Sequence, residues 1–192
     1  FDIKNTFSFF KREASSIGVP ERSIGIDIGS AGVKVVELRQ TKAAIILSTY
    51  GELQLGPYSD QPTGTTVKLD HEQSIHALVD VIRESGVTAK RGVLAVPLAS
   101  SFLTTISVEA ENAEDVAKMI PVEARKYIPI PLNEVALDWY EIESESNTEK
   151  ELAYHDLLLA AIQNESLTYY QRLLSAVGMH AQPTEIEAFS AI

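Results

Sequence analysis

The first part of the chain alternates between apolar and polar positions in the short runs that are typical of β-strands. Three runs rich in β-branched residues occupy residues 23–28 (SIGIDI), 33–40 (VKVVELRQ) and 44–55 (AIILSTYGELQL). Because only a few residues separate them, they predict an antiparallel meander. Residues 56–69 contain two glycines and two prolines and are predicted to form a loop.

The apolar spacing then changes to that of a helix. Asp70 followed by Gln73 predicts a capping box at a helix start. Apolar residues at helical spacing follow before Gly86: Ile75, Leu78, Val79 and Ile82. Residues 92–97 (GVLAVP) are almost entirely apolar, which predicts a strand buried on both faces.

Residues 98–163 have a different pattern, with one helix among three strands. Strands are predicted near residues 102–108, 135–143 and 152–162, and a helix from about residue 113 to residue 127, in which Pro121 is expected to cause a kink or a restart. The charged stretch 144–151 (SESNTEKE) is predicted to be a solvated hairpin tip. After it, Asn164 is expected to cap a helix that ends at Gly178, and residues 180–189 to begin a further strand and turn. The whole order predicts an α/β fold.

Composition excludes several classes of chemistry. The 192 residues are 45% hydrophobic and 22% charged, which is typical of a soluble globular protein with a real core. The formal net charge is −11, so the chain as a whole repels nucleic acid and anionic membranes, and no local basic patch is visible in the sequence. Cysteine is absent, which excludes disulfides, thiolate catalysis and cysteine zinc sites. The apolar runs are far shorter than the roughly 20 residues needed to span a bilayer.

Residues 1–22 are predicted to form an N-terminal arm and linker. The chain begins with Phe1 rather than methionine, so its start is expected to be trimmed or unseen. The segment FDIKNTFSFFKR lacks the apolar stretch and the cleavage site of a signal peptide. Its phenylalanines either pack on the chain's own domain, which we favour, or form a weak interfacial anchor.

A glycine-rich turn at residues 27–34 (DIGSAGVK) has two interpretations. In the first, Gly29 and Gly32, which tolerate positive φ and have no side chain to block a phosphate, let backbone N–H groups point into a nest for phosphate oxygens. Ser30 would donate its hydroxyl and Lys34 would neutralise phosphate charge, while Asp27 would hold Mg²⁺ through its water shell. In the second, the turn is a tight hairpin with a solvated aspartate and lysine. The spacing is neither that of a Walker loop nor that of a dinucleotide-binding turn.

Other candidate residues have simpler explanations. The four histidines lack the spacing of a metal-binding helix, and no serine lies in a nucleophile elbow. Glu185 and Glu187 are either catalytic acids or, as the safer interpretation, acids at a helix start. Residues 125–142 (RKYIPIPLNEVALDWYEI) contain two prolines and the only tryptophan. They either close a small core or form one side of an apolar groove for a partner peptide.

Three stretches in order, IGIDIGSAGVKVVEL, AVP and EARKYIPIPLNEVALDWYEI, resemble the PilM family of type IV pilus assembly proteins, which share the actin-like (RNase H-like) fold of the cell-division protein FtsA. The resemblance runs from about residue 23 to residue 192. It implies that residues 23–97 and 164–192 form subdomain 1A and that residues 98–163 form an inserted βαββ subdomain 1C. The second lobe of such proteins would follow Ile192, so the chain is expected to carry half of a nucleotide site.

The same resemblance implies a cofactor. The superfamily motif D-x-G-[ST]-x-x-x-K matches position by position at Asp27, Gly29, Ser30 and Lys34. These residues, with Ala31 and Gly32 between them, would bind ATP, and Asp27 would order the water shell of Mg²⁺. Hydrolysis is expected to be weak at most, even in complete members of the family.

The resemblance further implies partners and a location. PilM-like proteins lie on the cytoplasmic face of the inner membrane and bind the cytoplasmic N-terminal peptide of PilN in a groove between subdomains 1A and 1C. They connect it to the assembly motor. The sequence leaves self-association open, and a nucleic-acid partner is not expected. We place the groove near Leu98, Tyr127, Ile128 and Ile130.

Two alternatives belong to related classes. One is an FtsA-like division protein or the cytoplasmic scaffold of a type II secretion system; the segment KYIPIPLNEVALDW argues against FtsA. The other is a sugar or acetate kinase of the same superfamily, which would need a substrate-binding aspartate and a phosphoacceptor pocket. The sequence shows neither.

Overall fold

The computed structural model describes residues 21–142, 153–179 and 184–187, and the chain divides into two compact units. One unit contains the described residues up to Leu98 and those from Leu167 onward, and the other is Ala99–Ser166. The predicted arm before residue 21 and the predicted hairpin tip at 144–151 lie outside the described residues. Among the described residues, no helix is long and apolar enough to cross a membrane.

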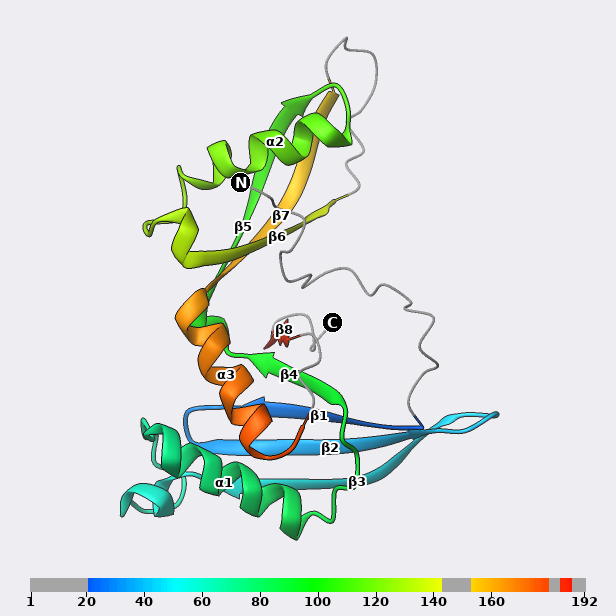
Figure 1. Cartoon of the computed structure of the whole chain (residues 1–192), viewed down its shortest axis with the longest axis vertical. Helices are drawn as coiled ribbons and strands as arrows, with labels where there is room; N and C mark the ends of the chain where they lie inside the picture. Colours follow the sequence, from blue (N-terminus) through cyan, green and yellow to red (C-terminus); the bar gives the residue numbers. More distant parts are fainter. Residues whose placement is uncertain (1–20, 143–152, 180–183, 188–192) are drawn as a thin grey trace. The chain divides into compact units, whose positions relative to one another are not determined.

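The first unit is built on a five-stranded sheet (Figure 1). Strand β1 (Arg22–Ile28) pairs antiparallel with β2 (Gly32–Gln40), and β2 pairs antiparallel with β3 (Ile45–Gln54), which confirms the predicted meander. Strand β4 (Gly92–Val96) runs parallel to β1, and β8 (Thr184–Ile186) runs parallel to β4, so the strand order is β3-β2-β1-β4-β8. Three of the five residues of β4 are buried, as its apolar sequence predicts.

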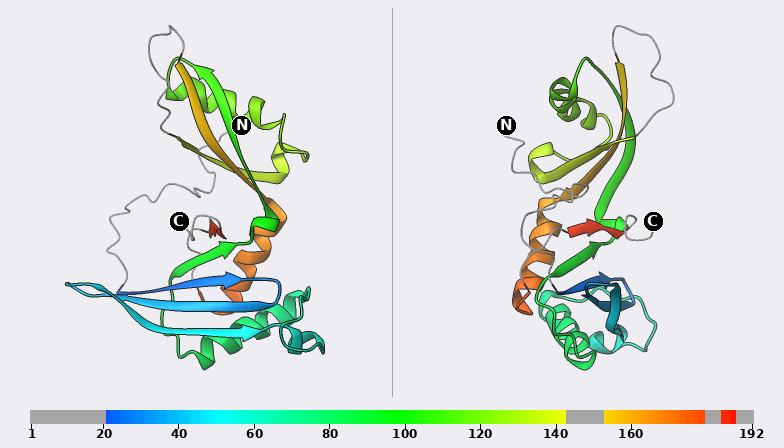
Figure 2. Two further views of the ribbon diagram at one scale, coloured as in Figure 1. Left: turned by 180° about the vertical axis from the view of Figure 1, so that it is seen from behind. Right: turned by 90° about the vertical axis from the view of Figure 1, so that its right-hand side faces the viewer.

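Two helices of this unit contact each other through side chains. Helix α1 (His71–Glu84) follows the short 3₁₀ helix η2 (Gly56–Ser59), and α3 (Asn164–Ala176) follows the second unit (Figure 2). The predicted capping box is present, since Gln73 N–H donates to Asp70 Oδ1 at 2.8 Å and Asp70 N–H donates to Gln73 Oε1 at 3.0 Å. The Tyr169 hydroxyl of α3 donates to Ser74 Oγ of α1 at 2.8 Å. Both helices bury apolar side chains, namely Ala77, Leu78, Val81, Leu167, Tyr170, Leu173 and Leu174.

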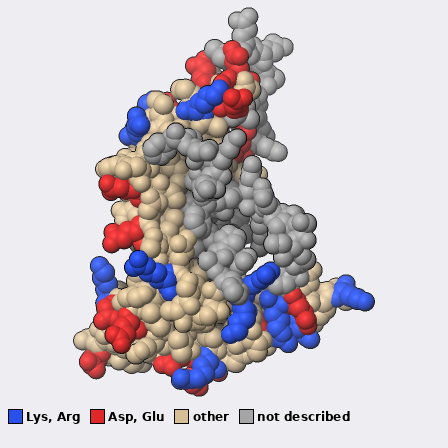
Figure 3. All heavy atoms as spheres, in the orientation of Figure 1, with Lys and Arg blue, Asp and Glu red and all other residues tan. Residues whose placement is uncertain are grey.

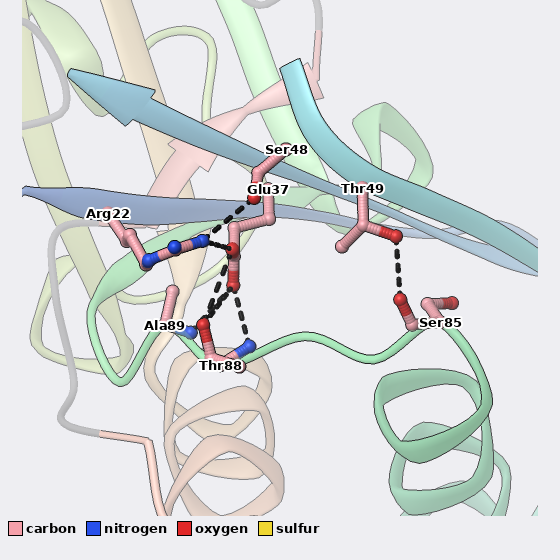
Figure 4. Close-up of polar contacts among 7 residues, drawn as sticks. All are labelled: Arg22, Glu37, Ser48, Thr49, Ser85, Thr88 and Ala89. Carbon is pink, nitrogen blue, oxygen red and sulfur yellow. Dashed lines mark hydrogen bonds and ion pairs between the residues drawn. The ribbon is translucent and has the colours of Figure 1, made fainter. Parts of the chain in front are cut away.

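A buried carboxylate fastens the segment after α1 to the sheet (Figure 4). Glu37 of β2 is 1% exposed, and its Oε2 accepts the N–H groups of Thr88 and Ala89 at 2.6 and 2.7 Å. Its Oε1 lies 2.7 Å from Nη1 of Arg22. Nearby, Thr49 Oγ1 donates to the Ser85 carbonyl at 2.6 Å, so the same face of β2 and β3 meets the end of α1. Burial raises the pKa of Glu37, but these hydrogen bonds outweigh burial and bring the pKa to about 2.

The second unit is a three-stranded antiparallel sheet with one helix. The turn η3 (Leu98–Ser100) leads into β5 (Ser101–Ala110), α2 (Ala113–Ala124) follows, and the short helix η4 (Leu132–Glu134) precedes β6 (Val135–Glu141) and β7 (Ala153–Gln163). Strand order is β5-β7-β6. The helix is continuous through Pro121, so no restart occurs there, and it ends three residues before the predicted end. Its start is capped by Asn112, whose side-chain oxygen accepts the N–H groups of Glu114 and Asp115 at 3.0 and 3.1 Å.

Candidate functional site

The glycine-rich turn joins β1 to β2 at one end of the five-stranded sheet. It is closed by the N–H of Gly29, which donates to the carbonyl of Gly32 at 3.0 Å. Asp27 and Lys34 are register partners on the two strands, so their side chains leave the same face of the sheet. Lys34 Nζ lies 3.8 Å from Asp27 Oδ2, and the two side chains are 61% and 39% exposed. The two charged residues that the sequence singled out are therefore adjacent and accessible.

The glycines of the turn have a different role from the predicted one. Among the described residues, positive φ occurs at Asp60, Gly64, Gly86 and Gly178 and not in this turn, so Gly29 and Gly32 do not use their tolerance of positive φ here. A Cβ atom on Gly32 would lie 3.2 Å from the Leu53 carbonyl oxygen, and one on Gly29 would lie 3.3 Å from the Gly32 carbonyl oxygen. The turn needs glycine because neighbouring backbone approaches closely.

Two other segments brace the turn through its carbonyl groups. Leu55 N–H donates to the Ala31 carbonyl at 2.8 Å, and Val67 N–H donates to the Ser30 carbonyl at 3.0 Å. The end of β3 and the loop before α1 therefore hold the turn in place. Within the described part of the chain, the N–H groups of Ser30 and Ala31 donate no hydrogen bond, so both are available to an anion.

Sequence reasoning missed two residues beside the turn, Glu52 and Gln54 of β3. They are the register partners of Lys34 and Gly32. Gln54 Nε2 donates to Glu52 Oε1 at 2.9 Å, and Gln54 Oε1 accepts the N–H of Gly64 at 3.1 Å, which ties the following loop to the sheet next to the turn. Their two-residue spacing is visible in the sequence, but assigning them to the face of Lys34 requires the hairpin register.

These groups fit a phosphate with a hydrated Mg²⁺ ion. The Lys34 ammonium and the free N–H groups favour anionic oxygens, and a carboxylate such as Asp27 is suited to the water shell of Mg²⁺. No group of three or more potential metal ligands occurs among the described residues, so a divalent ion here would depend on Asp27, water and phosphate oxygens. Glu185 of β8 lies at the same end of the sheet as Asp27. Ala95 of β4, between the two strands, pairs with Asp27 on one side and with Glu185 on the other.

The residues predicted to line a peptide groove differ in their exposure. Leu98, in the first unit, is 48% exposed, and Tyr127, in the second unit, is 46% exposed. Ile128 is 6% exposed and belongs to the core of the second unit, and Ile130 packs against that core. The alternative that this segment closes a small core therefore applies to Ile128, whereas Leu98 and Tyr127 are partly exposed. Glu187 accepts the N–H of Leu98 through Oε2 at 3.3 Å.

The fold is shared with solved structures of known assemblies. A chain of the PilM–PilN type IV pilus biogenesis complex matches with a TM-score of 0.71 at 19% identity, over 88% of this chain and 48% of that chain. The cytoplasmic domain of EpsL, an inner membrane component of the type II secretion system of Vibrio cholerae, matches with a TM-score of 0.57 at 9% identity, over 86% of this chain and 57% of that one. The chain thus spans about half the length of these proteins. The class is a mixed α/β protein with the PilM-like fold.

A family model defines the membership more closely. The model of the type IV pilus assembly protein PilM matches residues 25–192, which include the turn, nearly all of both sheets and the three α-helices of the described residues. The chain belongs to this family, as the sequence motifs predicted.

Proposed function

We propose that this chain is the nucleotide-binding and peptide-binding half of a cytoplasmic scaffold of the type IV pilus machinery. The observation that carries the proposal is the family match over residues 25–192, supported by the fold likeness to the PilM–PilN complex. In this proposal the unit with the five-stranded sheet is subdomain 1A and the three-stranded unit is the inserted subdomain 1C. In the same proposal, a second lobe of the actin-like fold accounts for the part of the matched relatives that this chain does not cover.

The partner in this proposal is the cytoplasmic N-terminal peptide of a PilN-like inner-membrane protein. Binding it would place the chain at the inner face of the membrane and connect that membrane protein to the assembly motor. Leu98 and Tyr127 are the contact candidates, because each exposes nearly half of its surface. Large, partly exposed aromatic side chains are the residues that contribute most to peptide interfaces.

Calorimetric titration of the folded chain with that peptide tests the proposed partner. We expect saturable binding, and we expect Tyr127→Asp to weaken it roughly tenfold or more, since a charge at a central contact costs well over 1 kcal/mol. Tyr154→Asp is the matched control, because Tyr154 lies in the same unit and is 49% exposed against 46% for Tyr127. A folded chain that fails to bind the peptide would contradict the proposed partner, and equal losses in both variants would remove Tyr127 from the contact.

The cofactor in this proposal is ATP with Mg²⁺, held at the turn between β1 and β2. Bound ATP would supply a polyphosphate that the free N–H groups, the Ser30 hydroxyl and Lys34 can bind, and Asp27 would hold the hydrated ion. Hydrolysis by these residues alone is not part of the proposal. Titration with Mg-ATP followed by amide NMR tests it, because weak binding at half a site still shifts resonances: the shifts should concentrate on Ser30, Ala31 and Gly32. Shifts spread over the whole sheet, or none at saturating nucleotide, would contradict it.

A further inference from the structure

The β2–β3 hairpin exposes apolar side chains from its tip, opposite the candidate phosphate turn, to Tyr50 in the middle of β3. Ile45, Leu47 and Tyr50 are 69%, 53% and 74% exposed, and Leu38 is 39% exposed. Leu38 is the register partner of Leu47, and a bulge between Glu37 and Leu38 brings Leu47 and Tyr50 to the same face although they are three residues apart. This face is the one opposite Glu37 and Thr49, whose side chains bond to residues after α1.

The same end of the sheet gathers basic residues from three separate segments. Arg22 is the register partner of Arg39, Lys42 lies in the hairpin turn, and Ile24 N–H donates to the carbonyl of Arg91, which follows Lys90. Arg22 is paired with Glu37, whereas Arg39, Lys42, Lys90 and Arg91 make no ion pair among the described residues. Figure 3 shows Lys and Arg side chains gathered at this end of the sheet, with few acidic side chains between them. No patch was visible in the sequence because these positions lie far apart along the chain.

Apolar side chains point to both faces of the hairpin tip. Ile45 and Leu47 leave one face, and Ile46, the register partner of Arg39, leaves the other and is 42% exposed. A protein partner docked on one face would leave the other apolar face in water, whereas a lipid surface can surround the tip. Two hydrogen bonds close the turn at the tip, because Thr41 N–H and Thr41 Oγ1 both donate to the Ala44 carbonyl, at 2.9 and 2.7 Å.

We propose that this hairpin end, defined by Leu38, Ile45, Ile46 and Leu47 with Arg39, Lys42, Lys90 and Arg91, binds directly to the surface of an anionic lipid bilayer. Charge complementarity between the basic hairpin end and an anionic bilayer supports this partner. Because the chain carries a net charge of −11, an anionic bilayer would repel it in orientations that do not present the hairpin end. Exposed aliphatic side chains beside lysines and arginines are the composition of an interfacial anchor. The inference goes beyond the proposed function, because this contact requires no peptide partner.

Vesicle co-sedimentation of the full chain tests the inference, using phosphatidylcholine vesicles with and without phosphatidylglycerol at low ionic strength. We expect binding to the anionic vesicles alone, weakened by salt. The double variant Arg39→Glu, Lys42→Glu should lower the partition coefficient at least roughly 30-fold, which corresponds to losing two surface bases. Its control is Lys118→Glu with Arg172→Glu, two exposed bases elsewhere with the same change in net charge. The control variant should lose only the small part of the binding that depends on net charge. It should therefore bind anionic vesicles far better than the hairpin variant.

A second pair of variants tests the apolar contribution. Ile45→Ser with Leu47→Ser should weaken binding about tenfold or more, because both side chains would enter the interface. Both are exposed in the folded chain, so the fold does not depend on burying them. Val122→Ser, 51% exposed on α2, is the control and should bind normally. Failure of the folded chain to bind anionic vesicles overturns the inference. The inference is also overturned if the hairpin variants bind normally and a triple variant of the N-terminal arm does not. That variant is Phe7→Ser, Phe9→Ser and Phe10→Ser, and its loss of binding would make the arm the anchor. The peptide titration is independent of all these results.

Discussion

Replacing Glu37 with glutamine should destabilise the five-stranded unit in a pH-dependent manner. The carboxylate is 1% exposed and accepts hydrogen bonds from the N–H groups of Thr88 and Ala89 and from Arg22. Glutamine has the same size but only one acceptor oxygen. Its NH₂ group would face either the Arg22 guanidinium or the two backbone donors, so at least one buried donor loses its partner.

The size of the effect follows from the pKa of Glu37, which falls from 4.5 to about 2. A shift of this size corresponds to roughly 3 kcal/mol of stability, from about 1.4 kcal/mol per pKa unit. Because the folded-state pKa is depressed, this stabilisation is complete above the unfolded-state pKa of 4.5 and is lost as pH falls towards 2. About 2 kcal/mol of it should already be lost at pH 3.

Urea denaturation followed by far-UV circular dichroism measures this difference at pH 7 and at pH 3. The gap in the free energy of unfolding between the wild type and Glu37→Gln should be about 3 kcal/mol at pH 7 and about 2 kcal/mol smaller at pH 3. Glu21→Gln, an exposed neighbour at the same end of the sheet, is the control and should change little at either pH. Trp139 lies in the other unit, so its fluorescence follows a part of the chain that Glu37 does not contact. A gap of equal size at both pH values would refute the assignment of the stabilisation to the ionised carboxylate.

Three further predictions concern a close approach, a helix cap and the candidate nucleotide site. Gly92→Ala should lower the free energy of unfolding by about 3 kcal/mol, because its Cβ would overlap the Ile24 carbonyl. Gly64→Ala, at φ of 82° in open space, should lower it by only about 1 kcal/mol. Equal losses of stability in urea denaturation would contradict this difference. Asp70→Ala should cost about 1 kcal/mol by removing the capping box of α1, and unchanged hydrogen exchange in the first turn of the helix would contradict it. Lys34→Ala should weaken Mg-ATP binding in the NMR titration at least tenfold, since hydrogen bonds to charged groups contribute about 1.5–3 kcal/mol, whereas Lys42→Ala should not.

Local sequence patterns were sufficient for most of the elements. The meander, the capping box at Asp70, the buried strand at residues 92–96 and the βαββ order of the second unit all follow from spacing over a few residues, and the structure confirms them. The helix after residue 112 ends earlier than predicted, at Ala124, because apolar spacing continues into a segment whose side chains reach the core without helical backbone. Ile128 is such a residue: its apolar character was evident, but its burial depends on what packs over it.

What the sequence determined by itself was therefore local: where strands and helices lie, the family, and the types of residue in the turn at 27–34. Only the tertiary structure decided which distant residues meet. It placed Glu52 and Gln54 beside Lys34 and Gly32, buried Glu37 under Thr88 and Ala89, and gathered basic residues at the hairpin end of an acidic chain. The physical reason is that periodicity reports which face of a strand a side chain occupies, whereas neighbours across a sheet depend on strand order and register, which are set by the packing of the whole unit.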